Sequence, residues 1–303
     1  MFAAGLALAA TSCHKDAARA PEGEVPGVGL VKPPNVAGTF YPGDAEELAA
    51  AVESRLRAAE PSPAAEEVVA VVTPHAGYDY SAGVAATAFR RLEGRRPATV
   101  VLLGPSHHCG SGEIATGTYD GYETPLGVAQ VDADFVAAVA ERCPDVVYTN
   151  VPFAKEHCLE VQLPFVQTLF PQARVAPFIF CRHDAEAAER FGKALAGAVE
   201  AADGDVLIVT TCDLSHYHPY DEAVALDRAF LAAFERFDAA ELYERLAKGE
   251  FEIDAPGAIA ATFRCAKELG ATKAVALEYK NSGDVTGDVS GGVVGYVAAA
   301  VVR

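Results

Sequence analysis

The sequence predicts an α/β fold, with a mostly parallel or mixed central sheet that carries helices on both faces. Two observations support this prediction. Short runs rich in Val, Ile and Leu alternate along the chain with longer segments whose apolar residues recur every four positions, the pattern of strands alternating with amphipathic helices. In addition, 51% of the 303 residues are hydrophobic and 22% are charged, so a single domain over residues 31–303 can bury a full-sized core.

Six segments have the length and composition of buried strands. Each is a short run of β-branched and aliphatic residues, bounded by polar or turn residues, as strands covered on both faces require. The predicted strands are residues 68–73, 99–103, 173–180, 205–211, 275–279 and 293–302.

Helices are predicted between these strands, because apolar residues recur with helical spacing after a residue suited to an N-cap. The expected caps are Asp44, Ser81, Asp184 and Asp221. The apolar stripes that follow them are Leu48, Val52 and Leu56; Val84, Ala88 and Leu92; Phe191, Leu195 and Val199; and Leu226, Phe230 and Phe234. A further helix is expected around residues 155–166, held to the sheet by Leu159, Leu163 and Val166.

The charge of the chain excludes some partners. The 24 Lys and Arg residues against 42 Asp and Glu residues give a net charge of −18, so neither nucleic acid nor an anionic membrane surface is an expected partner. No apolar run approaches the roughly 20 residues that a transmembrane helix needs. We therefore expect no transmembrane span.

Residues 1–30 are set apart as a leader or unstructured segment. Phe2 to Ala10 is a short apolar run, and Ala10-Thr11-Ser12-Cys13 resembles the lipidation box of a bacterial lipoprotein signal, although the usual basic residues before the apolar run are missing. We favour a lipid anchor at Cys13 and a location in the cell envelope over a cytoplasmic chain with an unstructured extension.

The seven cysteines lie far apart and form no C-x-x-C pair, which argues against a zinc ribbon or a thioredoxin-type site. We expect most of them to be small buried apolar residues rather than parts of a disulfide framework. The glycines form neither G-x-G-x-x-G nor a P-loop, so nucleotide binding has no support.

Histidines follow the four central predicted strands within about five residues. They are His75, His107, His183 and His216. Open α/β sheets bind ligands beyond the carboxyl ends of their strands, so residues far apart in the sequence can converge there. For a single histidine the simpler alternative is a turn residue that donates to a backbone carbonyl.

Several of these residues together predict a metal site. Imidazole and carboxylate ligands suit zinc, iron or copper, and two histidines with one carboxylate are typical of non-haem iron sites. The set that the sequence offers is His75, His107 and His216 with Asp213. From the segment after residue 154, His157 is the side chain expected to reach the same crevice.

The sequence gives weaker support for nucleophilic catalysis by residues of the same region. Ser106, Ser215 and Cys212 lie close in sequence to His107 or His216, but no G-x-S-x-G elbow is present. We expect Cys212 to be a buried residue at the end of a strand.

Seven sequence motifs together resemble the Memo family, whose bacterial members are called AmmeMemoRadiSam system protein B. The resemblance runs from about residue 32 to residue 303 and implies a fold similar to that of class III extradiol dioxygenases, which are non-haem iron enzymes. The motifs are Val36 to Pro42, Pro74 to Tyr78, Gly104 to His108, Glu156 to Pro164, Asp213 to His216, Asn281 to Asp284, and Gly295-Tyr296.

The resemblance also implies roles for particular residues. His75 and His107 correspond to metal ligands, and His216 corresponds to a ligand or an acid–base group with Asp213 beside it. His183 has no counterpart, so it is left out of the predicted site. We expect His216 and His157 to move protons, because a tuned imidazole works near neutral pH.

The chain departs from the family pattern in one place. Family members carry a Cys-Gly step in which the cysteine is a metal ligand, and we place Pro256 at that position. Because proline has no side-chain donor atom, either Asp213, His216 or Asp254 completes the metal shell, or the site binds metal weakly or not at all. For Asp254 we favour the role of an N-cap for the following helix.

Three functions remain open. The first is a metal-dependent, dioxygenase-like oxidoreductase with an iron or copper ion. The second is a non-catalytic binding or adaptor module that holds a small molecule or peptide and works with a radical-SAM protein partner. The third is a hydrolase in which zinc activates water.

Overall fold

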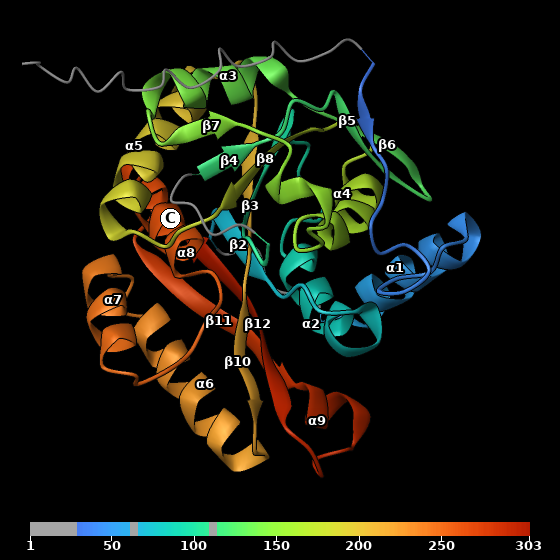
Figure 1. Cartoon of the computed structure of the whole chain (residues 1–303), viewed down its shortest axis with the longest axis vertical. Coiled ribbons are helices and arrows are strands. Elements are labelled where there is room, and N and C mark those ends of the chain that lie inside the picture. The colour runs from blue at the N-terminus through green and yellow to red at the C-terminus, as the bar shows by residue number, and fades with distance from the viewer. Residues whose placement is uncertain (1–28, 61–65, 109–113) are drawn as a thin grey trace, which may run out of the picture.

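A computed structural model describes residues 29–60, 66–108 and 114–303. A nine-stranded sheet runs through the centre of the molecule (Figure 1). Its middle is parallel, in the order β2, β9, β3, β8, while β12 and β10 continue it antiparallel on one side and β4 continues it antiparallel on the other. The predicted α/β class with a mixed, largely parallel sheet is therefore confirmed.

The six predicted strands are all present. Residues 68–73 and 293–302 match at both ends. The strands predicted at 99–103 and 275–279 extend two residues further at one end or both, and those predicted at 173–180 and 205–211 begin one residue later. The strands of the central sheet are β2 (Val68–Thr73), β3 (Thr99–Pro105), β4 (Ile114–Thr116), β7 (Val146–Tyr148), β8 (Arg174–Phe180), β9 (Val206–Thr211), β10 (Asp213–His218), β11 (Lys273–Asn281) and β12 (Val293–Val302). A separate three-stranded sheet holds β1 (Val31–Lys32), β5 (Gly121–Thr124) and β6 (Gly127–Gln130).

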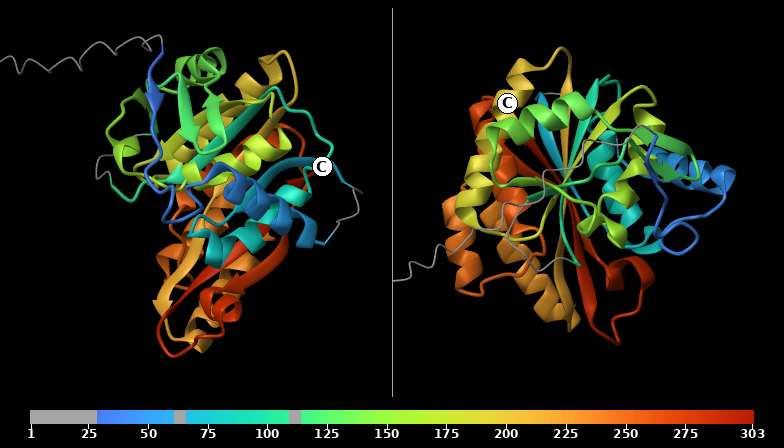
Figure 2. Two further views of the ribbon diagram at one scale, coloured as in Figure 1. Left: turned by 90° about the vertical axis from the view of Figure 1, so that its right-hand side faces the viewer. Right: turned by 45° about the horizontal axis from the view of Figure 1, so that its top comes forward.

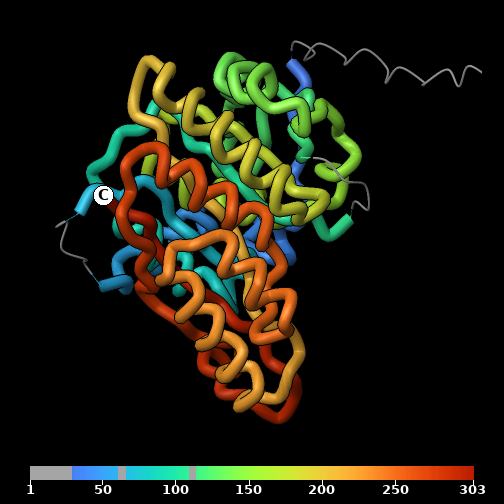
Figure 3. The backbone as a smooth tube through the Cα atoms, turned by 90° about the vertical axis from the view of Figure 1, so that its left-hand side faces the viewer, coloured from blue at the N-terminus to red at the C-terminus, as the bar shows by residue number. Residues whose placement is uncertain are grey.

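Helices cover both faces of the central sheet, as Figure 2 shows with the strands fanned between them. Alternate residues of each central strand enter different cores: Val100 and Leu102 of β3 face one core, while Val101 and Leu103 face the other. The first core contains α1 (Ala45–Ala58), α2 (Tyr78–Arg90) and α4 (Leu163–Leu169). The second contains α3 (Ala133–Arg142), α5 (Ala185–Ala201), α6 (Tyr220–Phe234), α7 (Ala239–Ala247) and α8 (Pro256–Glu268), and Figure 3 views this layer from outside.

Two of the four predicted helix caps are confirmed. The Asp44 carboxylate accepts hydrogen bonds from the backbone of Glu46 and Glu47, and that of Asp184 accepts one from Ala187. The prediction for Ser81 was wrong, because α2 already begins at Tyr78 and the Ser81 hydroxyl donates to the Ala76 carbonyl.

The prediction for Asp221 was also wrong. Helix α6 begins at Tyr220 after Pro219. Asp221 therefore lies in the first turn, where its charge still favours the helix dipole.

The cysteines largely follow the prediction. Cys143, Cys158, Cys212 and Cys265 are free and buried. Cys181 takes part in a disulfide bond, which was not expected from the sequence. Cys13 and the proposed lipidation box lie outside the described residues. Within the described ranges, no helix is both long and apolar enough to cross a membrane.

Candidate metal centre

Three histidines meet at the carboxyl edge of the parallel strands. His75 follows β2, His107 follows β3, and His157 comes from the turn before a short 3-10 helix, η2 (Glu160–Gln162). One ring nitrogen of each lies within 4.8 Å of those of the other two, close enough to share one metal ion. The predicted convergence at the strand ends is therefore observed for His75 and His107, and His157 joins them.

The rings pack closely on one another. The centroids of the His107 and His157 rings lie 4.7 Å apart in a stacked arrangement, and the His75 ring lies edge-on to both at 5.3 Å and 5.7 Å. His75 is 1% exposed, whereas the side chains of His107 and His157 are 32% and 18% exposed. The cluster thus has a buried end at His75 and an open end at His107.

A polar network fixes the His75 ring. The Thr211 hydroxyl donates to the Thr73 carbonyl oxygen at 3.0 Å and lies 2.9 Å from His75 Nδ1. Because the hydroxyl proton is already used, His75 Nδ1 is the donor in the second contact. Burial lowers the pKa of His75, but the charges of Asp213, Asp254 and Glu156 outweigh burial and raise that pKa to about 9. Nε2, which faces the cluster, therefore carries a proton at neutral pH unless a metal ion takes the place of that proton. Gln162 supports Thr211 by donating to its hydroxyl at 3.1 Å.

Glu156 fixes His107 in the same way. Its carboxylate lies 2.9 Å from His107 Nδ1 and accepts the backbone N–H of His107 at 2.7 Å and that of His157 at 2.8 Å. Burial raises the pKa of Glu156, but the bonds and charge of His107 outweigh burial and hold that pKa well below its usual range. An ionised carboxylate on the far nitrogen orients a histidine for metal binding. This role of Glu156 was not predicted from the sequence.

Residues around His157 form a turn rather than the expected helix. Glu156 accepts the backbone N–H groups of His157 and Cys158, and helical structure begins only at η2 and continues into α4. Burial, with the nearby charge of His75, lowers the pKa of His157 to about 4. His157 is therefore neutral at neutral pH.

Asp254 also reaches the cluster, and the prediction that it caps a helix was wrong. Ala255 is the N-cap of α8 and Pro256 is its first residue, whereas Asp254 Oδ1 accepts the backbone N–H of Asp213 at 3.1 Å. Asp254 Oδ2 lies 2.8 Å from His75 Nε2 and 3.8 Å from His107 Nε2.

Two atoms of this group have no hydrogen-bond partner although they are buried: His75 Nε2 and Asp254 Oδ2. They lie 2.8 Å apart, the distance of an ion pair between a protonated imidazole and a carboxylate, and neither bonds to a third polar group. Buried polar atoms are nearly always satisfied in proteins. A proton on His75 Nε2 pairs the two atoms, and a metal ion that replaces this proton can take both as ligands, so the donor set fits a metal ion.

Asp213 lies next to His75, but its carboxylate contacts mainly the backbone of His75 rather than the ring. Its Oδ1 accepts the His75 N–H at 2.8 Å, and its Oδ2 lies 3.9 Å from His75 Nε2. Burial raises the pKa of Asp213, while the charge of His75 acts to lower it. For Asp254 burial acts in the same direction, but His75 and the other histidines outweigh it and lower the pKa.

His216 stands on β10, on the flank of the site. Its Nδ1 lies 2.8 Å from the Leu214 carbonyl oxygen, and its ring lies edge-on to Tyr217 at 5.8 Å. The charge of the His216 ring acts to lower the pKa of both Asp213 and Asp254. His183 contacts α8 instead, where it accepts the backbone N–H of Gly257 at 3.4 Å.

Neither nearby thiol is placed as a nucleophile. Cys212 is fully buried as predicted, and burial raises its pKa well above the usual value. Burial has the same effect on Cys158, whose thiol donates to the Pro105 carbonyl at 3.1 Å.

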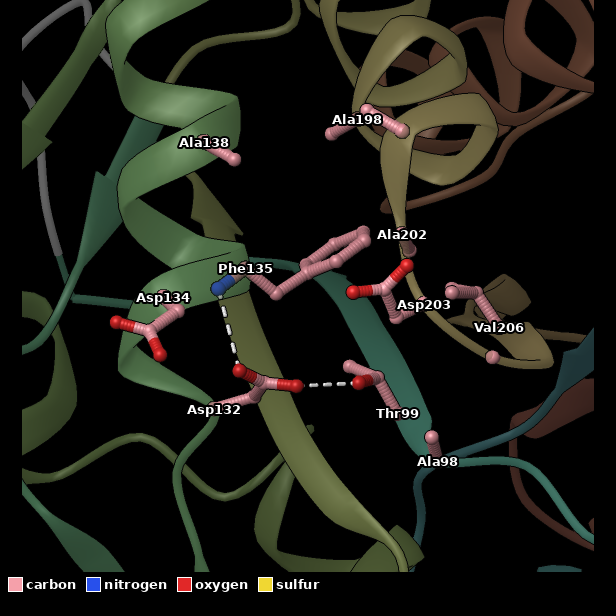
Figure 4. A pocket seen from close by; sticks show the side chains of 12 residues that line it. Ala98, Thr99, Asp132, Asp134, Phe135, Ala138, Ala198, Ala202, Asp203 and Val206 are labelled. Carbon is pink, nitrogen blue, oxygen red and sulfur yellow. Dashed lines mark hydrogen bonds between the residues drawn. The ribbon is translucent and has the colours of Figure 1, made fainter.

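A different cavity, of about 320 Å³, opens between α3 and α5 at the amino ends of β3 and β9 (Figure 4). The Asp132 carboxylate accepts hydrogen bonds there from the Thr99 hydroxyl and the Phe135 N–H. Because this cavity lies at the opposite edge of the sheet and its lining is mainly alanine and aspartate, it is separate from the histidine cluster.

The family model and the similar proteins all place this chain in one family. The model of the family described as "Memo-like protein" matches residues 32–300. A MEMO1 family protein of Methanopyrus kandleri is 35% identical over 278 residues, which cover 89% of this chain and 98% of the relative. One of Aquifex aeolicus is 37% identical over 266 residues, which cover 86% and 95% of the two chains. The chain therefore belongs to the Memo-like protein family.

Proposed function

We propose that this chain is a metal-dependent oxidoreductase that holds an iron or copper ion on His75 and His107. The observation that carries the proposal is the convergence of the His75, His107 and His157 nitrogens within 4.8 Å of one another, beside the buried Asp254 Oδ2, which lies 2.8 Å from His75 Nε2. Asp213 or Asp254 would supply a carboxylate ligand. Two histidines with one carboxylate are the ligand set of non-haem iron sites, which would leave positions open for O₂ or substrate.

The protein's own contribution is to orient the ligand atoms. Thr211 holds His75 by Nδ1 and Glu156 holds His107 by Nδ1, so that both Nε2 atoms face the shared space. When bound, the metal ion would act as a redox-active Lewis acid. Preorganised ligands of this kind need no rearrangement on metal binding.

His157 and His216 are the groups that we assign to proton transfer. Burial is the main cause that lowers the pKa of His157, to about 4, so its imidazole is neutral at neutral pH. A neutral, partly exposed imidazole can accept a proton from a substrate group beside the cluster. His216 stands on the half-exposed flank beside Asp213, where it can exchange protons with solvent.

The test is the metal content of protein purified without chelators and without air. Wild type, the double variant His75→Ala, His107→Ala, and the control variant His218→Ala are compared. His218 lies at the surface between Glu222 and Glu252. We expect near-stoichiometric iron or copper in wild type and control and its loss in the double variant. Oxygen consumption with candidate phenolic substrates then tests the reaction class.

Equal and negligible metal in all three proteins would contradict the proposal. The non-catalytic binding module would then be the better account. Retained zinc, with turnover of esters or amides in the absence of O₂, would instead favour the hydrolase.

A further inference from the structure

Resting on the proposed function, we infer that Asp254 is the carboxylate ligand and that it makes the site selective for ferrous iron over copper(I). The feature behind this inference is the pair formed by Asp254 Oδ2 and His75 Nε2. The two atoms are buried and lie 2.8 Å apart, and neither makes a hydrogen bond to a third group, so the pair faces the histidine cluster without other polar partners.

The distances agree with ligands of one ion. Two ligand atoms bound at about 2.1 Å lie about 3.0 Å apart at a right angle and about 3.4 Å apart at the tetrahedral angle. Asp254 Oδ2 lies 2.8 Å from His75 Nε2 and 3.8 Å from His107 Nε2, which brackets these values. The oxygen is thus placed to share an ion with both imidazoles.

Asp254 is held so that only one of its oxygens remains free. Oδ1 accepts the Asp213 N–H at 3.1 Å, and the Asp254 N–H itself contacts the Asp213 carbonyl at 3.3 Å. These contacts join the start of β10 to the segment before α8. Because Ala255 takes the N-cap position of that helix, the Asp254 side chain is not needed there and Oδ2 points to His75.

Asp213 is the less suitable carboxylate. Its Oδ1 is already used by the His75 N–H at 2.8 Å, and its Oδ2 lies 3.9 Å from His75 Nε2. It is better placed to hold the His75 backbone and, through its own backbone, Asp254.

The absence of a sulfur donor in the described cluster sets the metal preference. Cys158 Sγ donates to the Pro105 carbonyl and Cys212 Sγ to the Asp213 carbonyl, at 3.1 Å and 3.3 Å. Copper(I) prefers soft thiolate or thioether ligands, whereas imidazole with carboxylate is the ligand set of non-haem Fe(II).

The experiment titrates Fe²⁺, Cu(I) and Co²⁺ anaerobically into the full chain, with competing chelators to measure affinity. Variants are Asp254→Asn, Asp254→Cys and the control Glu252→Gln, which changes a surface carboxylate two residues away. Circular dichroism and thermal unfolding identify any variant that fails to fold, and the two Asp254 variants test the position independently.

We expect Asp254→Asn to weaken Fe²⁺ binding by at least about tenfold, with no change in the control. Asp254→Cys should raise the ratio of Cu(I) to Fe²⁺ affinity and give Co²⁺ a thiolate charge-transfer band that wild type lacks. If both Asp254 variants bind Fe²⁺ like wild type while His75→Ala does not, the role of Asp254 is refuted and the proposed metal site stands. If wild type binds none of the three ions, the proposed function and this inference both fail.

Discussion

Replacing Glu156 by glutamine tests how the site is organised. The carboxylate accepts from the backbone of His107, His157 and Cys158 and from the His107 ring. In the variant, Nε2 takes the place of the oxygen that faces the His107 N–H, 2.7 Å away in the native protein, so two donors oppose each other. One buried unsatisfied donor costs about 1–3 kcal/mol of unfolding free energy, and loss of an orienting partner typically costs 10–100-fold in metal affinity.

Urea unfolding and Fe²⁺ titration measure the two effects, with Glu123→Gln, an exposed change on β5, as the matched control. The effect of pH gives a third readout. Because the pKa of Glu156 is lowered by folding, its contribution to stability is complete above the unfolded value of about 4.5 and is lost as the pH falls. The wild type should therefore lose its stability advantage over Glu156→Gln in acid. A variant as stable as wild type at pH 7, with unchanged Fe²⁺ affinity, would refute the reasoning.

Other substitutions test separate parts of the account. Thr211→Val removes the acceptor of His75 Nδ1, so we expect about tenfold weaker Fe²⁺ binding or more; unchanged binding in the titration would show that Thr211 does not orient the ring. Gly295→Ala places a Cβ 2.1 Å from Asp227 Oδ2, and we expect a loss of at least about 1–3 kcal/mol from overpacking. Gly291→Ala, which meets no atom within 4 Å, should leave the melting temperature nearly unchanged, and equal melting temperatures for the two variants would contradict the packing seen at Gly295.

The sheet was predictable because its buried strands carry a strong local signal. Strands β2 and β12 are continuous runs of Val and Ala with few polar interruptions. Strand β10 was not predicted, because its sequence, Asp-Leu-Ser-His-Tyr-His, is polar and its pairing with β12 contains two register shifts. Only the tertiary pairing with β12 makes this segment a strand.

The site was predictable where the topology of the fold dictates position. His75 and His107 follow the ends of β2 and β3, which both pair with β9. Because open α/β sheets bind ligands at the carboxyl ends of their strands, the two histidines are expected to lie close together. Asp254 enters from the segment before α8, and its type favours a helix cap. The local signal that points the other way is Pro256, because proline favours the first helical position and so places the N-cap at Ala255. Glu156 was overlooked because its partners are mostly backbone groups of a turn that forms only in the folded chain.

The most direct test of the central claim is anomalous diffraction at the iron edge from crystals grown with Fe²⁺ in the absence of air. The account predicts one strong peak within bonding distance of His75 Nε2, His107 Nε2 and Asp254 Oδ2. An iron peak elsewhere, or none at this position in protein that keeps the fold described, would contradict it.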